Sequence, residues 1–494
     1  MSPRRALATD PKPTPGAKTT DVKSYNLRVI TPIMGGGAQA QQSDDADPIR
    51  VPEIRGHLRF WWRALVGHRQ RYCGTDGLAK LRADEAEIFG GTALGGDEES
   101  KESKVKLWVE WGNAPKKGVT IPAGVHEVNP NTHKPKPLPN WAFGAGAGYA
   151  LFPLQRPSAE LQGNAPVPTA KVRVGHNQQF ATRFVEFTLH LDHSRLGAPA
   201  KADVEAAFRC WVLFGGIGAR TRRGLGALMD IDRVPASAEL GTATAFSEFT
   251  GRIGIGLPAV EETAHDWPTL EGARLRVGTQ SFPDPYQAWK AAVTEFQKFR
   301  QAPDGRDAAP AGANHPGRSK WPEPNALRRL ADGRGHKPAN WAHPPHQNDD
   351  IFFPRADFGL PIIFKFKDDR NDPRKDEPAN AMLTHEDTDR FGSPLIIRPF
   401  AFRNAQDQVR YCAMALVLNG VKPRQLVGDL VVKTQPGAHP GLPYRPTAAE
   451  LHDRTKAARV APMNAHHTGT AADNALDSFL TYFTAQQRAY RLVF

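Results

Sequence analysis

The chain has 494 residues, enough for two domains with sizeable cores, and carries a formal net charge of +12. Such a positive excess favours a polyanionic partner, because every phosphate that is neutralised releases condensed counterions. Three widely separated cysteines exclude a disulfide framework and a Cys-x-x-Cys zinc site, and indicate a reducing compartment. No signal peptide and no apolar run of membrane-spanning length is evident, so we expect a cytoplasmic protein with no membrane partner.

The first 240 residues are predicted to hold one domain behind a leader. Residues 1–22, rich in Pro, Lys and Thr, are expected to be disordered, and the N-terminal domain is expected over 23–240. Alternating apolar residues predict strands at 25–29, 105–111, 185–191 and about 225–234. Helices are predicted at 52–66 and after Asp203, the expected N-cap of the second. A Pro- and Gly-rich stretch at 112–167 is interpreted as an insertion.

The rest of the chain is predicted to repeat this plan after a linker at 241–270. The C-terminal domain spans 271–494, with an insertion at about 301–350. Its predicted strands and helices are 274–277, 286–300, 361–367, 395–402, 411–418 and 476–492. The order strand, helix, strand, strand, helix, strand in the first domain is that of a ferredoxin-like sandwich. We therefore predict an α+β fold of two ferredoxin-like (RRM-like) domains with long loop insertions.

The densest basic signal lies in the first predicted helix. Arg55, Arg59 and Arg63 are four residues apart, so a helix places them along one stripe, while an apolar face lies beside them. Like charges at this spacing repel one another, so a partner is expected: RNA phosphates, an acidic protein surface, or distant carboxylates of the same chain. Arg50 and Trp62, from the same segment, join the predicted RNA-binding residues.

A glycine-rich loop at 215–226 is the second signal. It leaves a helix rather than a strand, and Thr221 replaces the third glycine of a dinucleotide-binding fingerprint, so that function is excluded. Glycines allow close approach of another backbone, and Arg220, Arg222 and Arg223 add charge at the same place. The loop is either an RNA-binding element, which we favour, or a tight solvent-exposed turn.

These segments together resemble the RAMP superfamily, and within it the first-numbered RAMP subunit of the type III-B CRISPR (Cmr) effector complex. The resemblance spans about residues 26–419. It is carried by Thr31-Pro32 with Gly35-Gly36-Gly37, Ile54-Arg55-Gly56 and Arg59-Phe60-Trp61-Trp62-Arg63, Glu87-Ile88-Phe89-Gly90, the loop at 215–226, Gly317 to Glu323, Phe358-Gly359-Leu360-Pro361 and Ser393 to Arg398. Glu53 departs from the small hydroxyl residue expected before the helix motif.

The resemblance implies two RAMP domains in a non-catalytic, RNA-binding subunit that caps an antiviral CRISPR ribonucleoprotein. Its expected partners are guide RNA near the 3′ end, the paired target RNA and other RAMP subunits of the complex. No cofactor, metal site or catalytic residue is expected. Further candidates for RNA contact are Lys171, Arg173, Arg318 and Lys320.

One enzymatic alternative remains. Related RAMP proteins cut guide precursors without metal, using a histidine as general base, and His57 could take that role. No partner acid for His57 is visible in the sequence. The short matches at 95–98, 343–346 and 466–467 are interpreted as chance, because zinc or cyclase chemistry needs further converging ligands.

Overall fold

A computed structural model describes the elements that carry the candidate site. It covers residues 22–35, 49–91, 100–111, 119–122, 126–128, 135–137, 145–151, 169–172, 185–255, 267–301, 303–308, 319–332, 352–366, 380–385, 390–420, 430–434, 460–464 and 474–493. The predicted leader lies outside these residues except for Val22, which begins the first strand. The chance matches at 95–98, 343–346 and 466–467 also lie outside them.

The first domain is built as predicted from alternating apolar residues and two amphipathic helices. Its elements are β1 (Val22–Val29), α1 (Val51–Val66), α2 (Gly77–Phe89), β3 (Lys106–Trp111), β8 (Val185–Asp192), α4 (Ala198–Phe214) and β9 (Leu228–Asp230). The antiparallel sheet has the order β3-β8-β1-β9. In β1, Tyr25, Leu27 and Val29 are buried while Ser24 and Asn26 are exposed. This is the ferredoxin-like arrangement.

The second domain repeats the same topology. It comprises β10 (Thr269–Val277), α6 (Pro285–Arg300), β13 (Leu395–Arg403), β14 (Val409–Asn419), α11 (Ala475–Gln487) and β16 (Tyr490–Val493). The sheet order β13-β14-β10-β16 matches that of the first domain strand for strand. The prediction of two ferredoxin-like domains is therefore confirmed.

Two predicted elements of the second domain differ from the structure. The helix expected at 476–492 ends at Gln487, because Arg488 adopts a left-handed conformation with φ 47°, and residues 490–493 then pair with β10 as β16. The strand expected at 361–367 is shorter, β11 (Ile362–Phe364). It lies in a separate three-stranded sheet with β12 (Ala381–His385) and β15 (Leu430–Thr434), near α7 (Glu323–Asp332).

Two details of the first domain also differ. Asp203 is not an N-cap: α4 begins earlier, behind Gly197, and the Asp203 carboxylate instead accepts two hydrogen bonds from Arg69, at 2.7 and 2.6 Å. The predicted linker contains α5 (Ala243–Arg252), which is capped by the Thr242 hydroxyl.

Small elements decorate the first domain. Strands β2 (Ile33–Met34), β4 (Val119–Pro122) and β7 (Thr169–Val172) form a sheet in the order β2-β7-β4, while β5 (His126–Val128) pairs with β6 (Pro135–Pro137). Helix α3 (Ala145–Ala150) lies between β6 and β7 in the chain and packs against α6.

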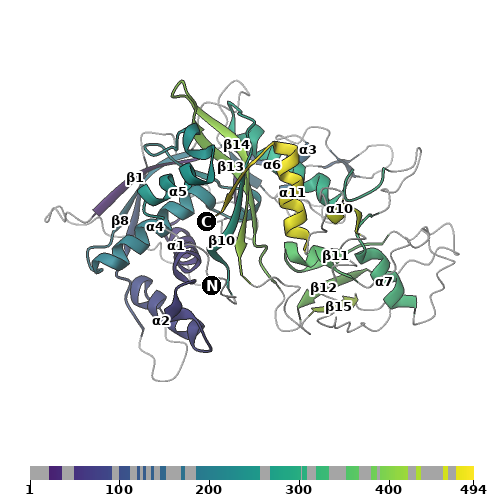
Figure 1. The fold of residues 1–494 in the computed structure, drawn as a ribbon, viewed down its shortest axis with the longest axis horizontal. Helices are drawn as coiled ribbons and strands as arrows, with labels where there is room; N and C mark the ends of the chain where they lie inside the picture. Colours follow the sequence, from purple (N-terminus) through teal and green to yellow (C-terminus); the bar gives the residue numbers. More distant parts are fainter. Residues whose placement is uncertain are drawn as a thin grey trace.

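The two domains share a hydrophobic core. Figure 1 shows β10, β13 and β14 between α1, α4 and α5 of the first part of the chain and α6 and α11 of the second. Alternate residues of β13 face opposite ways: Ile396 packs into the cluster that holds α1 and α4, and Ile397 packs into the cluster of α6 and α11. The second sheet is thus buried on both faces, whereas the outer face of the first sheet carries exposed polar side chains.

Candidate nucleic-acid interface

The glycine loop between α4 and β9 folds over the residues following β1. The amide of Ala219 donates to the Met34 carbonyl at 2.7 Å, and the amide of Gly226 donates to the Pro32 carbonyl at 2.7 Å. Gly218 has φ +85°, and a Cβ there would lie 2.6 Å from the Met34 oxygen, so no larger residue fits. The two segments that carry the sequence resemblance, around residue 32 and at 215–226, are one structural unit.

The loop is also bound to the start of α1. The Glu53 carboxylate accepts a hydrogen bond of 2.5 Å from the amide of Gly218. The helix itself has no side-chain cap at Arg50 and begins with Pro52 in its first turn. Glu53, which departs from the expected sequence pattern, therefore joins the first turn of α1 to the loop.

Three arginines from these joined segments have no acidic partner in the described part of the chain. Arg50 and Arg55 belong to the start of α1, and Arg220 belongs to the loop; all three are partly exposed. Within the described residues, the Nε atom of each is buried without a hydrogen-bond partner. Arg220 also has a left-handed backbone, with φ 61°, and burial lowers the pKa of its guanidinium. We call Arg50, Arg55 and Arg220 the loop–helix arginines.

The two later arginines of the α1 stripe have an internal partner. Arg59 and Arg63 both donate to Oε1 of Glu85 on α2, Arg63 at 2.5 Å. Glu85 is only 4% exposed, whereas about a third of each arginine side chain remains accessible. One carboxylate between two guanidinium groups leaves a net positive charge, but both arginines are held by the protein. Pairing with a distant carboxylate was one of the alternatives that the sequence left open, but Glu85 could not be predicted as the partner because no sequence pattern indicated a buried acid on α2.

Arg222 and Arg223 connect the two domains. Arg222 donates to the Ser393 carbonyl at 2.7 Å, and Arg223 donates to the Leu395 carbonyl at 3.0 Å. Burial lowers the pKa of both guanidinium groups, that of Arg223 to about 9, with Arg220, Arg300 and Arg222 adding repulsion. In this structure their donors are directed at carbonyl oxygens of β13 and of the residues before it, so both side chains have a structural role, and their contact with RNA stays a prediction.

The remaining residues predicted to contact RNA have different surroundings. Trp62 is 2% exposed and packs edge-on against Phe89, so it is a core residue and offers no face to a nucleobase. Lys320 donates to the Pro303 carbonyl at 3.0 Å. Lys171 lies in β7, opposite Ile33, and Arg173 and Arg318 fall outside the described residues.

His57 has the acidic neighbour that the sequence did not reveal. Its Nε2 atom lies 3.7 Å from Oε1 of Glu53, one helical turn earlier, and its ring stacks on Trp211 at 6.2 Å. The same Glu53 oxygen accepts the Gly218 amide. The imidazole is thus held against the helix and partly covered, which is typical of a packing residue.

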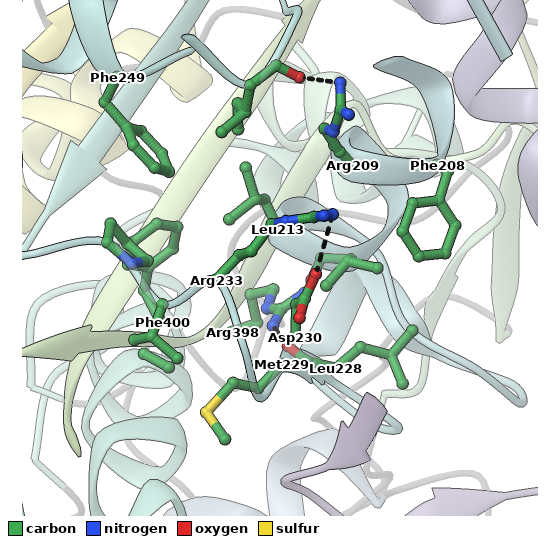
Figure 2. Close-up of a pocket in the computed structure, with 15 residues that line it drawn as sticks. Phe208, Arg209, Leu213, Leu228, Met229, Asp230, Arg233, Phe249, Arg398 and Phe400 are labelled. Atoms are coloured by element: carbon green, nitrogen blue, oxygen red, sulfur yellow. Dashed lines mark hydrogen bonds and ion pairs between the residues drawn. The ribbon is translucent and has the colours of Figure 1, made fainter. Parts of the chain in front are cut away.

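A pocket at the domain junction lies apart from these arginines. Figure 2 shows it between α4, β9, α5 and β13, with Phe208, Phe249 and Phe400 in its walls. Arg398 lies at its base and donates to backbone carbonyls, while Asp230 and Arg233 form an ion pair at 4.0 Å. Its lining is largely apolar and contains none of the loop–helix arginines.

In the part of the chain that the structure describes, no helix is both long and apolar enough to cross a bilayer. The same residues contain no cluster of three or more His, Cys, Asp or Glu side chains arranged to hold a metal ion. Cys73, Cys210 and Cys412 are free thiols.

The two βαββαβ units define a protein of two ferredoxin-like domains. Residues 26–228 match the RAMP superfamily. The match includes α1, the loop at 215–226 and the residues around Pro32 that the loop covers.

Solved structures show weaker similarity over more of the chain. Cmr1 from Pyrococcus furiosus, in its apo form, is 15% identical with a TM-score of 0.40, covering 95% of this chain and 98% of that chain. A chain of the type III-B Cmr-beta complex bound to cognate target RNA is 12% identical with a TM-score of 0.39, covering 80% and 94%. TM-scores below 0.5 do not establish a common fold for the whole chain. No curated protein sequence matches it significantly.

Proposed function

We propose that this protein is a non-catalytic RNA-binding subunit of a type III-B CRISPR effector complex. In this role it contacts guide RNA near its 3′ end and the paired target RNA, next to other RAMP subunits. The RAMP domain and the motifs that resemble the Cmr subunit support the class of complex. The loop–helix arginines carry the proposal that the chain binds RNA.

The physical argument rests on uncompensated charge. Each loop–helix arginine is partly buried without an acidic partner among the described residues, which is costly unless an anion binds there. Guanidinium groups suit phosphate oxygens because their donors form a planar fork. The contacts would read the RNA backbone rather than its bases, as expected where a guide supplies the sequence by base pairing.

The proposal is tested by measuring RNA affinity against salt concentration. Wild type should lose affinity as salt rises, with a slope of about −0.7 for each single-strand phosphate contacted. Substituting alanine for Arg50, Arg55 and Arg220 together should weaken binding and flatten the slope. Arg252→Ala is the control, because Arg252 is 58% exposed and pairs with Glu239. A triple variant with unchanged affinity and slope would rule out these contacts.

A salt-independent affinity in the wild type would instead favour an adaptor whose arginines meet other proteins. Assembly of a reconstituted complex would test this adaptor role. The same triple variant should then fail to join the other subunits of a reconstituted complex while leaving RNA binding as it was.

The alternative is a metal-independent endoribonuclease, and the contact between His57 and Glu53 is the observation in its favour. Repeat-containing RNA incubated with purified protein in EDTA should remain intact under our proposal. Cleavage that disappears in His57→Ala but persists in Arg252→Ala would establish the nuclease.

A further inference from the structure

Behind the loop–helix arginines lies a second group of positive charges. The group consists of three arginines of the glycine loop, Arg220, Arg222 and Arg223, together with Arg300 and Arg355 from later in the chain. Arg300 contacts Tyr149 of α3 and the aromatic rings of Phe296 and Phe358, and Arg223 lies over the Phe296 ring. Arg220 and Arg355 interact electrostatically with Tyr149, and Arg222 does so with Arg223. Arg300, at the end of α6, was not singled out by the sequence, because a single arginine in a helical last turn is ordinary.

Contacts around one ring place two of the members, Arg223 and Arg300, together. The guanidinium of Arg223 lies 4.7 Å from the centre of the Phe296 ring, and that of Arg300 lies 5.5 Å from the same centre. Arg300 also donates to the hydroxyl of Tyr149 at 3.1 Å. The Tyr149 hydroxyl therefore lies beside the guanidinium of Arg300, and it also interacts electrostatically with Arg220, Arg223 and Arg355.

Among the residues that the structure describes, acidic groups do not balance this charge. In the described part of the chain, Glu323 is the carboxylate paired with a member of the group, and it is held by Arg355 at 3.1 Å. Arg222 and Arg223 are directed at carbonyl oxygens. Arg220 and Arg300 each keep a buried Nε atom without a hydrogen-bond partner. Four of the five charges thus lack a counter-charge there, an arrangement that an absent anion would stabilise.

The backbone of Arg220 is a separate indication. Its φ of 61° is unusual for a residue with a side chain, and the structure holds it there by the hydrogen bonds of the loop. Strained backbones that a protein maintains are concentrated at ligand-binding positions.

We propose that Arg220, Arg300 and Tyr149 bind the terminal phosphate of an RNA chain, a refinement that rests on the RNA-binding function proposed above. A terminal phosphomonoester carries about −1.5 to −2 charge at neutral pH, whereas an internal diester carries one negative charge, so the monoester better matches several uncompensated guanidinium groups. It also has three acceptor oxygens, which suit two arginine forks and a hydroxyl. The positive charge of Arg223 would also attract the phosphate, without direct contact.

The experiment compares RNA oligonucleotides of one sequence that differ at their ends. One carries a 5′-phosphate, one a 3′-phosphate, and one hydroxyl groups at both ends; the full-length protein is titrated with each by fluorescence anisotropy. One phosphorylated form should bind about tenfold more tightly than the hydroxyl form. Which form does so identifies the end that is recognised. Inorganic phosphate should reduce the preference by competition.

Substitutions at Arg300 and Tyr149 test whether these residues cause the preference for phosphorylated RNA. Arg300→Met should abolish it, Tyr149→Phe should reduce it, and Arg252→Met should retain it. Arg300→Lys, which keeps the charge and lacks the fork, should restore part of it, and circular dichroism checks that each variant is folded. Equal affinity of the wild type for all three RNAs would overturn the inference while leaving the proposed function standing. Failure to bind any of them would overturn both.

Discussion

Arg398, on β13 of the second domain, donates a hydrogen bond of 2.6 Å to the carbonyl oxygen of Gly215, at the end of α4 in the first domain. The same guanidinium reaches the Val212 carbonyl at 3.0 Å and also the Leu228 carbonyl. Burial, with no carboxylate beside it, lowers the pKa of Arg398 to about 9. One side chain thus fixes the end of α4, the start of β9 and the edge of the second sheet together.

Arg398→Met should therefore destabilise the protein. The substitution leaves three buried carbonyl oxygens without their donor, which outweighs the relief of burying a charge, and we expect a loss of about 3 kcal/mol in the free energy of unfolding. Urea denaturation measures it. Arg233→Met, at a side chain 53% exposed, should change stability by less than about 0.5 kcal/mol. Equal stability of the two variants would contradict the assigned role.

Gly218→Ala should disrupt the loop. Its positive φ and the 2.6 Å approach to the Met34 oxygen make a Cβ incompatible with the observed backbone, and we expect a loss of about 2 kcal/mol together with weaker RNA binding. Gly56→Ala is the matched control, because Gly56 lies within α1 and a Cβ added there would meet nothing within 4 Å. It should stabilise the helix by about 1 kcal/mol. Similar effects at both glycines would show that the loop geometry is not critical.

Glu85→Gln should strengthen RNA binding. Removing the carboxylate frees Arg59 and Arg63 for phosphates, so affinity should rise and the salt slope should steepen by about 0.7 for each phosphate gained. The control is Glu87→Gln on the same helix, which changes net charge equally but frees Lys101 and Lys104 instead. If both variants bind RNA equally well, the effect is one of net charge and not of the α1 stripe.

Tyr25→Phe should stabilise the protein, increasingly so at alkaline pH. The buried Tyr25 hydroxyl has no hydrogen-bond partner among the described residues, so its removal should add about 1 kcal/mol at neutral pH. Burial, then the Glu205 carboxylate, raises the pKa of Tyr25 to about 12. The unfolded chain loses this proton near pH 10 and the folded protein near 12, so wild-type stability falls across that window.

The advantage of Tyr25→Phe should accordingly be about 1.4 kcal/mol larger at pH 11 than at pH 8. Urea denaturation of both proteins at the two pH values gives the difference. A constant advantage would mean that Tyr25 titrates in the folded protein as it does in the unfolded chain.

Sequence patterns predicted a helix or strand correctly where one face of that element is apolar. The strands and helices of the first sandwich were predicted because Tyr25, Leu27 and Val29 alternate with polar residues, and because Ile54 and Leu58 lie one turn apart in α1. Helix α2 was missed for the opposite reason. Its inward face includes the buried acid Glu85, while Leu78 is 39% exposed, so its apolar residues do not form a clear helical face.

The candidate site was only partly predictable because pairing between distant segments leaves no local pattern. The spacing of Arg55, Arg59 and Arg63 was visible in the sequence, but the carboxylate that holds two of them belongs to another helix. Likewise, nothing near Arg222 indicates that its partner is a carbonyl 171 residues away. Burial and pairing, rather than residue type, separate the loop–helix arginines from the structural ones.

The second sheet, with one face in each hydrophobic cluster, has a thermodynamic consequence. Ile396 and Met414 help to bury α1 and α4, so melting either half would expose the interior of the other to water. Neither half is then an independent folding unit, and calorimetry should record one cooperative heat absorption instead of two. The loop at 215–226 and β13 would therefore keep their relative position until the whole molecule unfolds.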